Sequence, residues 1–210
     1  MENCAIQIMD ITSLKGVLAD LRKRILPSRI EKIQQSDSHT LQIAFRTLKK
    51  VSWIEISWHA DSARIVEIET PPRIKGESTL SKQIKFGSRD MALIEIKQEG
   101  FERIVEFGLS FRPTEKPSKI ILIELMGRHS NLLFLNNERT VITIAKQIRD
   151  SKSRLRPIST GDKYIPPPGL QGITPKSNQS YQEWKEDISV IPIPLKDAIK
   201  ETCDKHTIYL

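Results

Sequence analysis

The side chains best suited to bind a ligand form a polar row at residues 124–131, ELMGRHSN. Glu124 interrupts an otherwise apolar run, and a carboxylate there is costly unless it is paired or lies at the rim of a sheet. After a glycine that permits a sharp bend, Arg128 can grip phosphate or guanine with two hydrogen bonds. His129 can stack on a base and Asn131 can read a base edge. The alternative is a polar hairpin turn around a satisfied glutamate–arginine pair, and residue chemistry leaves both open.

A second candidate lies at residues 100–103, GFER, where a strand is expected to start. Neighbouring side chains in a strand point to opposite faces, so Glu102 and Arg103 cannot both face the core. At a turn, however, both can reach one ligand. The alternative is an exposed ion pair that contributes at most about 1 kcal/mol.

Other chemistry has little support in the sequence. The four histidines lie far apart along the chain, and neither cysteine belongs to a paired metal-ligand spacing, so no metal is expected. There is no glycine-rich phosphate loop and no GxSxG nucleophile motif, so no nucleotide cofactor or triad chemistry is expected. We therefore expect a binding module rather than an enzyme.

The composition suggests the kind of partner. The 210 residues include 33 lysines and arginines against 26 acidic residues, and the net charge of +7 favours an anionic partner such as nucleic acid or an acidic membrane. Hydrophobic residues make up 38%, which excludes a disordered chain. No apolar run reaches the roughly 18–20 residues of a membrane span, and residues 1–10 do not read as a secretory signal. A cytoplasmic location is expected.

The elements that must position these residues follow from hydrophobic spacing. Residues 10–25 carry apolar side chains on one helical face, with Asp10 as a candidate N-cap and Pro27 beyond the end. A second, shorter helix is expected at residues 79–86. Strand patterns occur at residues 29–35, 40–47, 51–58, 64–69, 91–97, 103–111, 119–126, 131–135 and 141–148. Residues 119–126 are nearly continuously apolar, which indicates a central strand.

Helices do not alternate with these strands, so a parallel sheet is unlikely and an antiparallel arrangement is expected. The predicted fold class is α+β, mainly an antiparallel β-sandwich with an edge helix, followed by the start of a helical region. The domains are predicted as a β domain at residues 1–150, a proline- and glycine-rich linker at 151–178, and the start of a truncated helical region at 179–210.

Three motifs in the same order resemble the N-terminal domain of the NFACT family, whose members include the RqcH and NEMF proteins, formerly called fibronectin-binding protein A-like. They are GFERIVEF at residues 100–107, MGRHSN followed by LLFLN at 126–136, and RPISTGDKYIPPP at 156–168. The resemblance covers about residues 8–170. It implies a β-sandwich like that of formamidopyrimidine-DNA glycosylases, followed by a helix-hairpin-helix region.

The resemblance also implies a function in ribosome-associated quality control. Such proteins bind large ribosomal subunits obstructed by peptidyl-tRNA and recruit alanyl-tRNA, and the nascent chain is extended with an alanine tail. The family's Asp-Arg pair, needed for tRNA engagement, falls on Glu102 and Arg103, with glutamate in place of aspartate. A glutamate and an arginine of the second motif fall on Glu124 and Arg128. These two pairs are predicted to form one patch that contacts the anticodon arm of tRNA, with His129 and Asn131 as further contributors.

The sequence departs from the family pattern because it stops before the expected coiled coil and second NFACT domain. Tail synthesis would then need those domains from another chain. Two alternatives follow from the family's older name and its fold. One is a cell-surface fibronectin-binding adhesin, and the other is a glycosylase-like nucleic-acid lyase. The lyase would need an N-terminal proline as nucleophile, whereas position 2 here is Glu2.

Overall fold

A computed structural model describes residues 9–74, 76–148 and 156–167 of the chain. The chain divides into two compact units, one of residues 1–99 with 103–165 and one of residues 100–102 with 166–210. All helices and strands of the described residues belong to the first unit. The short helices predicted at residues 180–188 and 194–203 lie outside the described residues, so the predicted start of a helical region stays a prediction.

The first helix, α1 (Ile11–Ile25), begins where the sequence predicts. The Asp10 carboxylate accepts a hydrogen bond of 2.7 Å from the backbone N–H of Ser13, which satisfies one of the open donors at the helix start. Three basic residues in the last turn suit the negative end of the helix dipole. The buried face consists of Ile11, Leu14, Leu18, Leu21 and Ile25.

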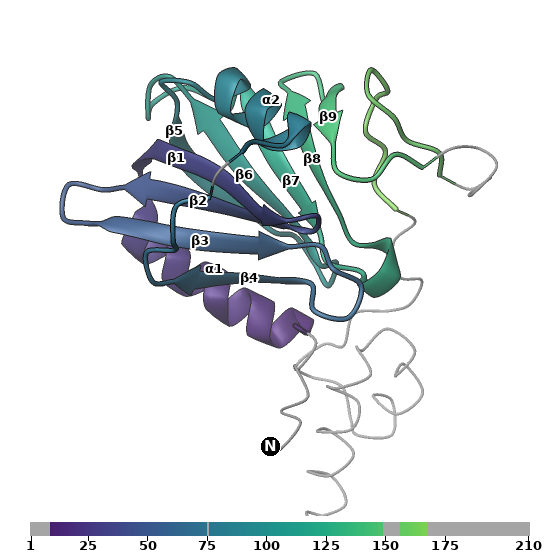
Figure 1. Cartoon of the computed structure of the whole chain (residues 1–210), viewed down its shortest axis with the longest axis horizontal. Coiled ribbons are helices and arrows are strands. Elements are labelled where there is room, and N and C mark those ends of the chain that lie inside the picture. The colour runs from purple at the N-terminus through teal and green to yellow at the C-terminus, as the bar shows by residue number, and fades with distance from the viewer. Residues whose placement is uncertain (1–8, 75, 149–155, 168–210) are drawn as a thin grey trace, which may run out of the picture. The chain divides into compact units, whose positions relative to one another are not determined.

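Nine antiparallel strands form one sheet, in the order β4-β3-β2-β1-β5-β6-β7-β8-β9 (Figure 1). This confirms the mainly antiparallel α+β class. The strands are β1 (Ser28–Asp37), β2 (Thr40–Arg46), β3 (Val51–Ser57), β4 (Arg64–Ile68), β5 (Ala92–Lys97), β6 (Ile104–Ser110), β7 (Lys119–Glu124), β8 (Asn131–Asn136) and β9 (Val141–Ile144).

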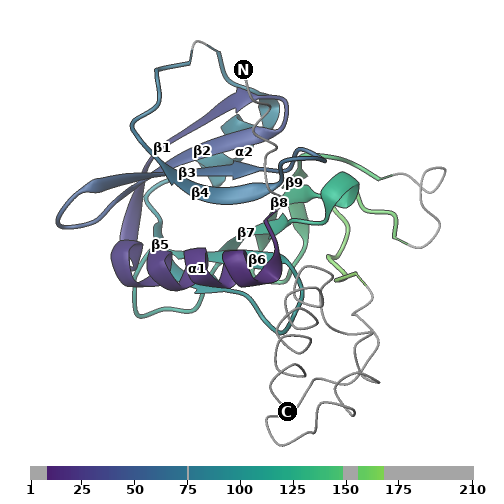
Figure 2. The ribbon, with the colours of Figure 1, turned by 90° about the horizontal axis from the view of Figure 1, so that it is seen from below.

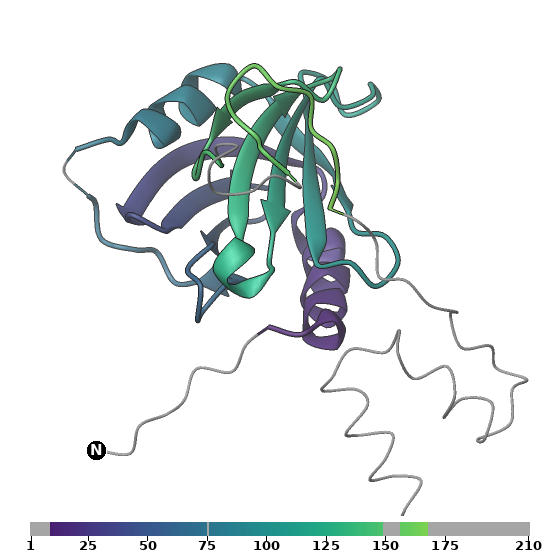
Figure 3. The same cartoon turned by 90° about the vertical axis from the view of Figure 1, so that its right-hand side faces the viewer.

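The sheet bends so strongly that its two halves face each other across a shared core. Strand β1 pairs with β5 only through Ser28 and Arg29. The ring of Phe45 in β2 packs edge-on against that of Phe107 in β6, with centroids 6.2 Å apart, although β1 and β5 separate these strands in the sheet. In Figure 3 the purple and blue strands β1 to β4 turn out of the plane of the green strands of the second half. The predicted sandwich is therefore one continuous sheet folded over its own core.

Two helices bridge strands that lie far apart in this bent sheet. Helix α1 contacts β4 and β5, and it lies alongside the half of the sheet that contains β5 and β6 (Figure 2). Helix α2 (Thr79–Gly87) contacts β1 and the edge strand β9. Each helix thus covers apolar side chains that the bend would otherwise leave exposed.

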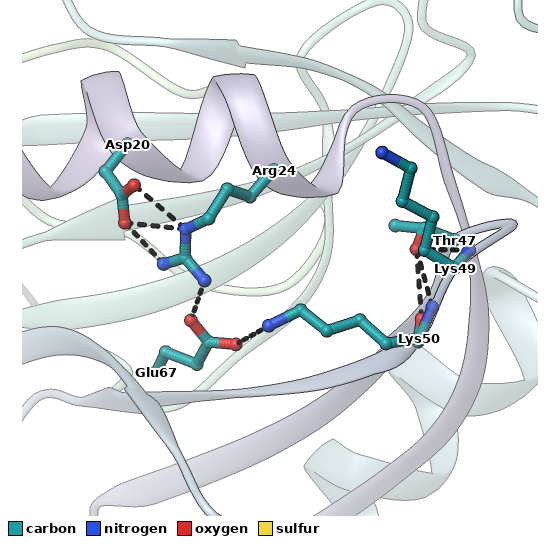
Figure 4. Close-up of polar contacts among 6 residues, drawn as sticks. All are labelled: Asp20, Arg24, Thr47, Lys49, Lys50 and Glu67. Carbon is teal, nitrogen blue, oxygen red and sulfur yellow. Dashed lines mark hydrogen bonds and ion pairs between the residues drawn. The ribbon is translucent and has the colours of Figure 1, made fainter.

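An ion-pair cluster ties α1 to the edge of the sheet (Figure 4). Arg24 donates to Asp20, one turn earlier, at 2.8 and 2.9 Å, and also to Glu67 of β4. The ammonium group of Lys50 donates to the second oxygen of Glu67 at 3.1 Å. The hydrogen bonds that Arg24 donates to Asp20 and Glu67 raise the pKa of its guanidinium, so this cation stays charged.

A second, smaller core lies on the other face of β7 and β8. Both strands are buried on both faces, as their nearly continuous apolar sequences predict. The chain from residue 156 to 165, here called the exit segment, packs on this face through bridges of Ile158 to Ile148 and Lys163 to Thr140. Part of the predicted linker is therefore built into the domain. The second core consists of Leu122, Leu133, Leu135, Val141, Ile144, Ile158 and Tyr164.

Two glycine substitutions, one in each helix, should have opposite effects on stability. A Cβ atom on Gly87 would lie 2.5 Å from the ring of Phe134, which is fully buried. We expect Gly87→Ala to lower the free energy of unfolding by about 1–3 kcal/mol, because the ring cannot move away freely. Gly16 lies at an exposed position of α1, where an added Cβ atom would meet no atom within 4 Å. Gly16→Ala should therefore raise the free energy of unfolding by about 0.5–1 kcal/mol. Urea unfolding followed by tryptophan fluorescence measures both, and a stable Gly87→Ala variant would contradict the packing described.

Candidate nucleic-acid interface

The sheet brings Arg103 and the polar row of residues 124–131 together at one end of its second half. In the ladder, Ile104 at the start of β6 is paired with Glu124 at the end of β7, and Glu124 is paired with Asn131 at the start of β8. Adjacent antiparallel strands run in opposite directions, so the end of one meets the start of the next. Arg103 and the polar row are therefore neighbours although they lie more than twenty positions apart. We call this region the polar end.

Glu124 is the buried centre of the polar end, with 1% of its surface exposed. Its carboxylate accepts two hydrogen bonds from the guanidinium of Arg156, at 2.5 and 3.2 Å, and one of 2.8 Å from the hydroxyl of Tyr164. Glu124 is therefore satisfied, as the alternative of a polar turn requires, but its cation comes from the exit segment and not from Arg128. Three charge-assisted or polar bonds compensate a carboxylate that would otherwise be very costly to bury.

Tyr164 is held between two arginines. The guanidinium carbons of Arg139 and Arg156 lie 5.1 and 5.2 Å from the centre of its ring, and Arg139 also pairs with Glu106 of β6 at 2.7 Å. Burial raises the pKa of the Tyr164 hydroxyl far above its usual range, and the Glu124 carboxylate raises it further. The hydroxyl therefore stays protonated and serves as a donor.

Arg156 and Tyr164 are the residues that sequence reasoning missed. Both stand in the third family-like motif, RPISTGDKYIPPP, but nothing local assigns either of them to Glu124. The available signal was the unexplained carboxylate in β7 together with an arginine and a tyrosine in a segment otherwise rich in proline and glycine. The structure thus joins the second and third motifs through one buried hydrogen-bonded cluster.

Asn131 is also buried, with 1% of its surface exposed. Its amide nitrogen donates to the carbonyl of Lys146 at 2.9 Å, and its oxygen accepts from the backbone N–H groups of Leu132 and Lys146, each at 3.0 Å. The ammonium group of Lys146 in turn donates to the carbonyl of Trp58 at 3.2 Å. Asn131 therefore fastens the start of β8 to the chain beyond β9, and its side chain does not lie on the surface.

The exposed part of the polar end is the short 3-10 helix η1 (Gly127–His129). Gly127 has a φ of 56°, a conformation that glycine adopts without strain. Arg128 and His129 are both exposed, and the arginine donates to the Nε2 atom of the imidazole at 3.1 Å. Among the described residues, no carboxylate forms an ion pair with Arg128. An oriented cation thus projects from this turn with its charge uncompensated.

The two remaining candidates precede β6. Arg103 is half-buried, and its guanidinium donates to the carbonyl of Met9 at 3.3 Å, while its own carbonyl accepts from Leu125 at 2.9 Å. Glu102 is half-buried and belongs to the second compact unit, so it is not placed against the polar end. Two of the six predicted contacts are thus buried at the polar end, namely Glu124 and Asn131. Three others can present polar atoms there, namely Arg103, Arg128 and His129.

No three histidine, cysteine, aspartate or glutamate side chains within residues 9–74, 76–148 and 156–167 come together as a metal site. No helix in the same ranges is both long and apolar enough to cross a membrane.

Comparison with known proteins gives a consistent family. The sequence profile described as "NFACT N-terminal and middle domains" matches residues 10–203. A protein of Streptococcus pneumoniae named "Rqc2 homolog RqcH" is 26% identical over 166 residues, covering 77% of this chain and 30% of that protein. The protein of the same name from Bacillus subtilis is 24% identical over 203 residues, covering 88% of this chain and 36% of that protein. The chain thus spans about a third of the length of these curated relatives.

Solved structures show the same fold. The N-terminal region of the fibronectin/fibrinogen-binding protein of Streptococcus suis matches with a TM-score of 0.74 and 23% identity, over 84% of this chain and 68% of that one. The N-terminal domain of the fibronectin-binding protein PavA of Streptococcus pneumoniae matches with a TM-score of 0.73 and 24% identity, over 90% and 72%.

The buried cluster predicts that Glu124 is far more important for stability than a comparable surface carboxylate. Glu124→Gln replaces the buried charged acceptor of Arg156 and Tyr164 with a neutral amide, and we expect a loss of about 3–5 kcal/mol in the free energy of unfolding. Glu99→Gln is the matched control, because Glu99 is exposed and pairs with Lys97 at 2.9 Å; its loss should stay below about 1 kcal/mol. Urea unfolding compares the two variants, and equal losses would show that the cluster does not hold the exit segment.

Proposed function

The chain belongs to the NFACT N-terminal domain family, and from this premise we propose that it is a tRNA-binding module of a ribosome-associated quality-control factor. In this proposal it acts in the cytoplasm on large ribosomal subunits obstructed by peptidyl-tRNA. It helps to recruit alanyl-tRNA for the addition of a C-terminal alanine tail. Its own part is binding rather than catalysis.

The observation that carries the proposal is the exposed Arg128 at the tip of η1. An arginine can bind phosphate or guanine with two parallel hydrogen bonds, and such a contact is strongest when no carboxylate competes for the cation. The hydrogen bond to His129 orients the guanidinium, and the imidazole offers a flat face on which an unstacked base can lie. Arg103, half-buried at the neighbouring strand start, adds a second cation.

The buried side chains support this surface without touching the RNA. Glu124 is engaged by Arg156 and Tyr164, and Asn131 is engaged by the backbone around Lys146. We therefore propose that both are positioning residues, which hold the strand ends that carry Arg103 and Arg128. This changes the part assigned to Glu124 and Asn131 by the family resemblance, where both were expected to contact tRNA.

The matched relatives named RqcH are about three times as long as the region they share with this chain. We propose that the shared region supplies tRNA recognition and that tail synthesis also requires the family's other domains. Those domains would come from the same protein or from another chain. The predicted division into a β domain, a linker and the start of a helical region at residues 179–210 belongs to this proposal, with the exit segment counted as part of the β domain.

Binding to tRNA tests the assignment of the two arginines. The double variant Arg103→Ala with Arg128→Ala should bind tRNA-Ala at least about 30-fold more weakly, because each lost arginine contact removes about 1–3 kcal/mol and two are lost. Fluorescence anisotropy at several salt concentrations measures the affinity, and the slope against log salt should become shallower. Arg128→Ala alone should show part of the loss with an unchanged melting temperature, since this side chain is exposed.

Arg112→Ala is the matched control, because Arg112 is an exposed arginine at the far end of β6. If the double variant binds tRNA-Ala as tightly as the unmodified chain, or if Arg112→Ala loses as much, the polar end is not the tRNA site. Immobilised fibronectin provides a further arm, since two structural neighbours are named for binding it. Saturable fibronectin binding without tRNA binding would favour the adhesin alternative.

A further inference from the structure

A second basic surface lies at the opposite end of the strands from the polar end. It is a groove of about 570 Å³ between the first half of β1 and the C-terminal end of α2, here called the β1–α2 groove. Arg29 in the groove is paired with Ala92 of β5, which is paired with Ser110 at the end of β6. The polar end begins at Ile104, six residues earlier in β6. At about 3.3 Å per residue, the two surfaces are roughly 20 Å apart.

The groove follows from the way in which β1 leaves its neighbour. Only Ser28 and Arg29 pair with β5. A register irregularity between Ile30 and Lys32 then bends β1 against β2, as bulges generally do. Beyond this point β1 diverges from β5, and α2 packs beside it. The groove thus follows from the course of the backbone at this point of the sheet.

Positive charge exceeds negative charge along the groove. Five cationic side chains line it, namely Arg29, Lys32, Arg46, Lys85 and Arg89, against the two carboxylates of Glu31 and Asp90. Glu31 is paired with Arg46 at 2.6 Å, and Asp90 is shared between Arg29 at 3.0 Å and Arg89 at 3.7 Å. Lys85 is paired with Glu77 at 2.5 Å, from outside the groove lining. Among the described residues, Lys32 has no carboxylate partner. The groove can therefore accept anionic groups without first breaking an ion pair at every cation.

An exposed aromatic ring lines the same groove. Phe86 in the last turn of α2 has 69% of its surface exposed, whereas Leu80 and Ile84 of the same helix are buried in the core. The ring is mostly exposed, so packing in the core does not account for a phenylalanine at this site. Cations that follow a groove, together with an accessible aromatic face, are the combination by which proteins hold single-stranded nucleic acids.

We propose that the β1–α2 groove binds single-stranded RNA, with one base stacked on Phe86 and backbone phosphates bound by Lys32 and Arg89. The occupant follows from three features. The excess of cations favours an anion, and the exposed ring favours a ligand with flat faces. The concave shape disfavours a flat membrane surface, which could not reach Ile33 in the lining. An acidic peptide would match the charge but would leave the ring without a partner. The groove adds a second RNA contact, and its failure would leave the polar end unaffected.

The test uses the full 210-residue chain and a labelled uridine 12-mer in fluorescence anisotropy. Phe86→Ala should weaken binding by about 5- to 100-fold, the range measured for losing one base–aromatic stack, whereas Phe86→Tyr should bind as the unmodified chain does. Phe111→Ala is the matched control, because Phe111 is also an exposed phenylalanine but does not line the groove. The double variant Lys32→Gln with Arg89→Gln should make the log-affinity against log-salt slope shallower by about 1.4, since two phosphate contacts are lost.

Two outcomes would overturn the proposal. One is unchanged affinity in Phe86→Ala, or an equal loss in Phe111→Ala. The other is displacement of the 12-mer by a glutamate 12-mer peptide at the same concentration as by unlabelled uridine RNA, which would identify an acidic-peptide site. Arg128→Ala separates the two surfaces, because it should weaken tRNA binding at the polar end and leave binding of the 12-mer within about twofold. Thermal unfolding of each variant confirms that the exposed substitutions leave the fold intact.

Discussion

The constraint on which the rest of the domain depends is the buried carboxylate of Glu124. A charged group at 1% exposure is tolerated only when its hydrogen-bonding capacity is met. Arg156 and Tyr164 meet it, and both come from the exit segment. Their attachment brings Ile158 and Tyr164 onto the outer face of β7 and β8, where they help to form the second core. One polar cluster thereby covers a sheet face that would otherwise expose a row of leucines.

The same cluster separates the polar end into a buried layer and an exposed layer. Glu124 is hydrogen-bonded to the exit segment and Asn131 to the backbone, so both hold strand ends in place. Arg128 and His129 stand on the turn between those strand ends and keep their polar atoms accessible. A recognition surface of this kind depends on rigid support, because an arginine on a loosely held turn would lose side-chain and backbone freedom on binding.

The bend of the sheet explains why two separate basic surfaces exist on one small domain. Where β1 parts from β5, α2 packs beside the opening and leaves the β1–α2 groove between itself and the strand. On the other side, α1 spans β4 and β5 and is fastened to β4 through Arg24 and Glu67. Within the described residues, cationic side chains thus lie both in the groove and on η1.

Local patterns in the sequence determine most of the elements. Alternating or nearly continuous apolar patterns predict all nine strands to within a few residues. The apolar spacing after Asp10 predicts α1 with its N-cap, because such signals depend only on neighbours along the chain. Three ordered motifs also determine the family. Only the tertiary structure decides that Arg156 pairs with Glu124, that one bent sheet replaces two, and that Lys32, Phe86 and Arg89 share a groove. The pairing of Arg156 with Glu124 joins residues more than thirty positions apart, and the bend and the groove depend on where β1 leaves β5. Strand order and curvature set such contacts, and no local spacing encodes them.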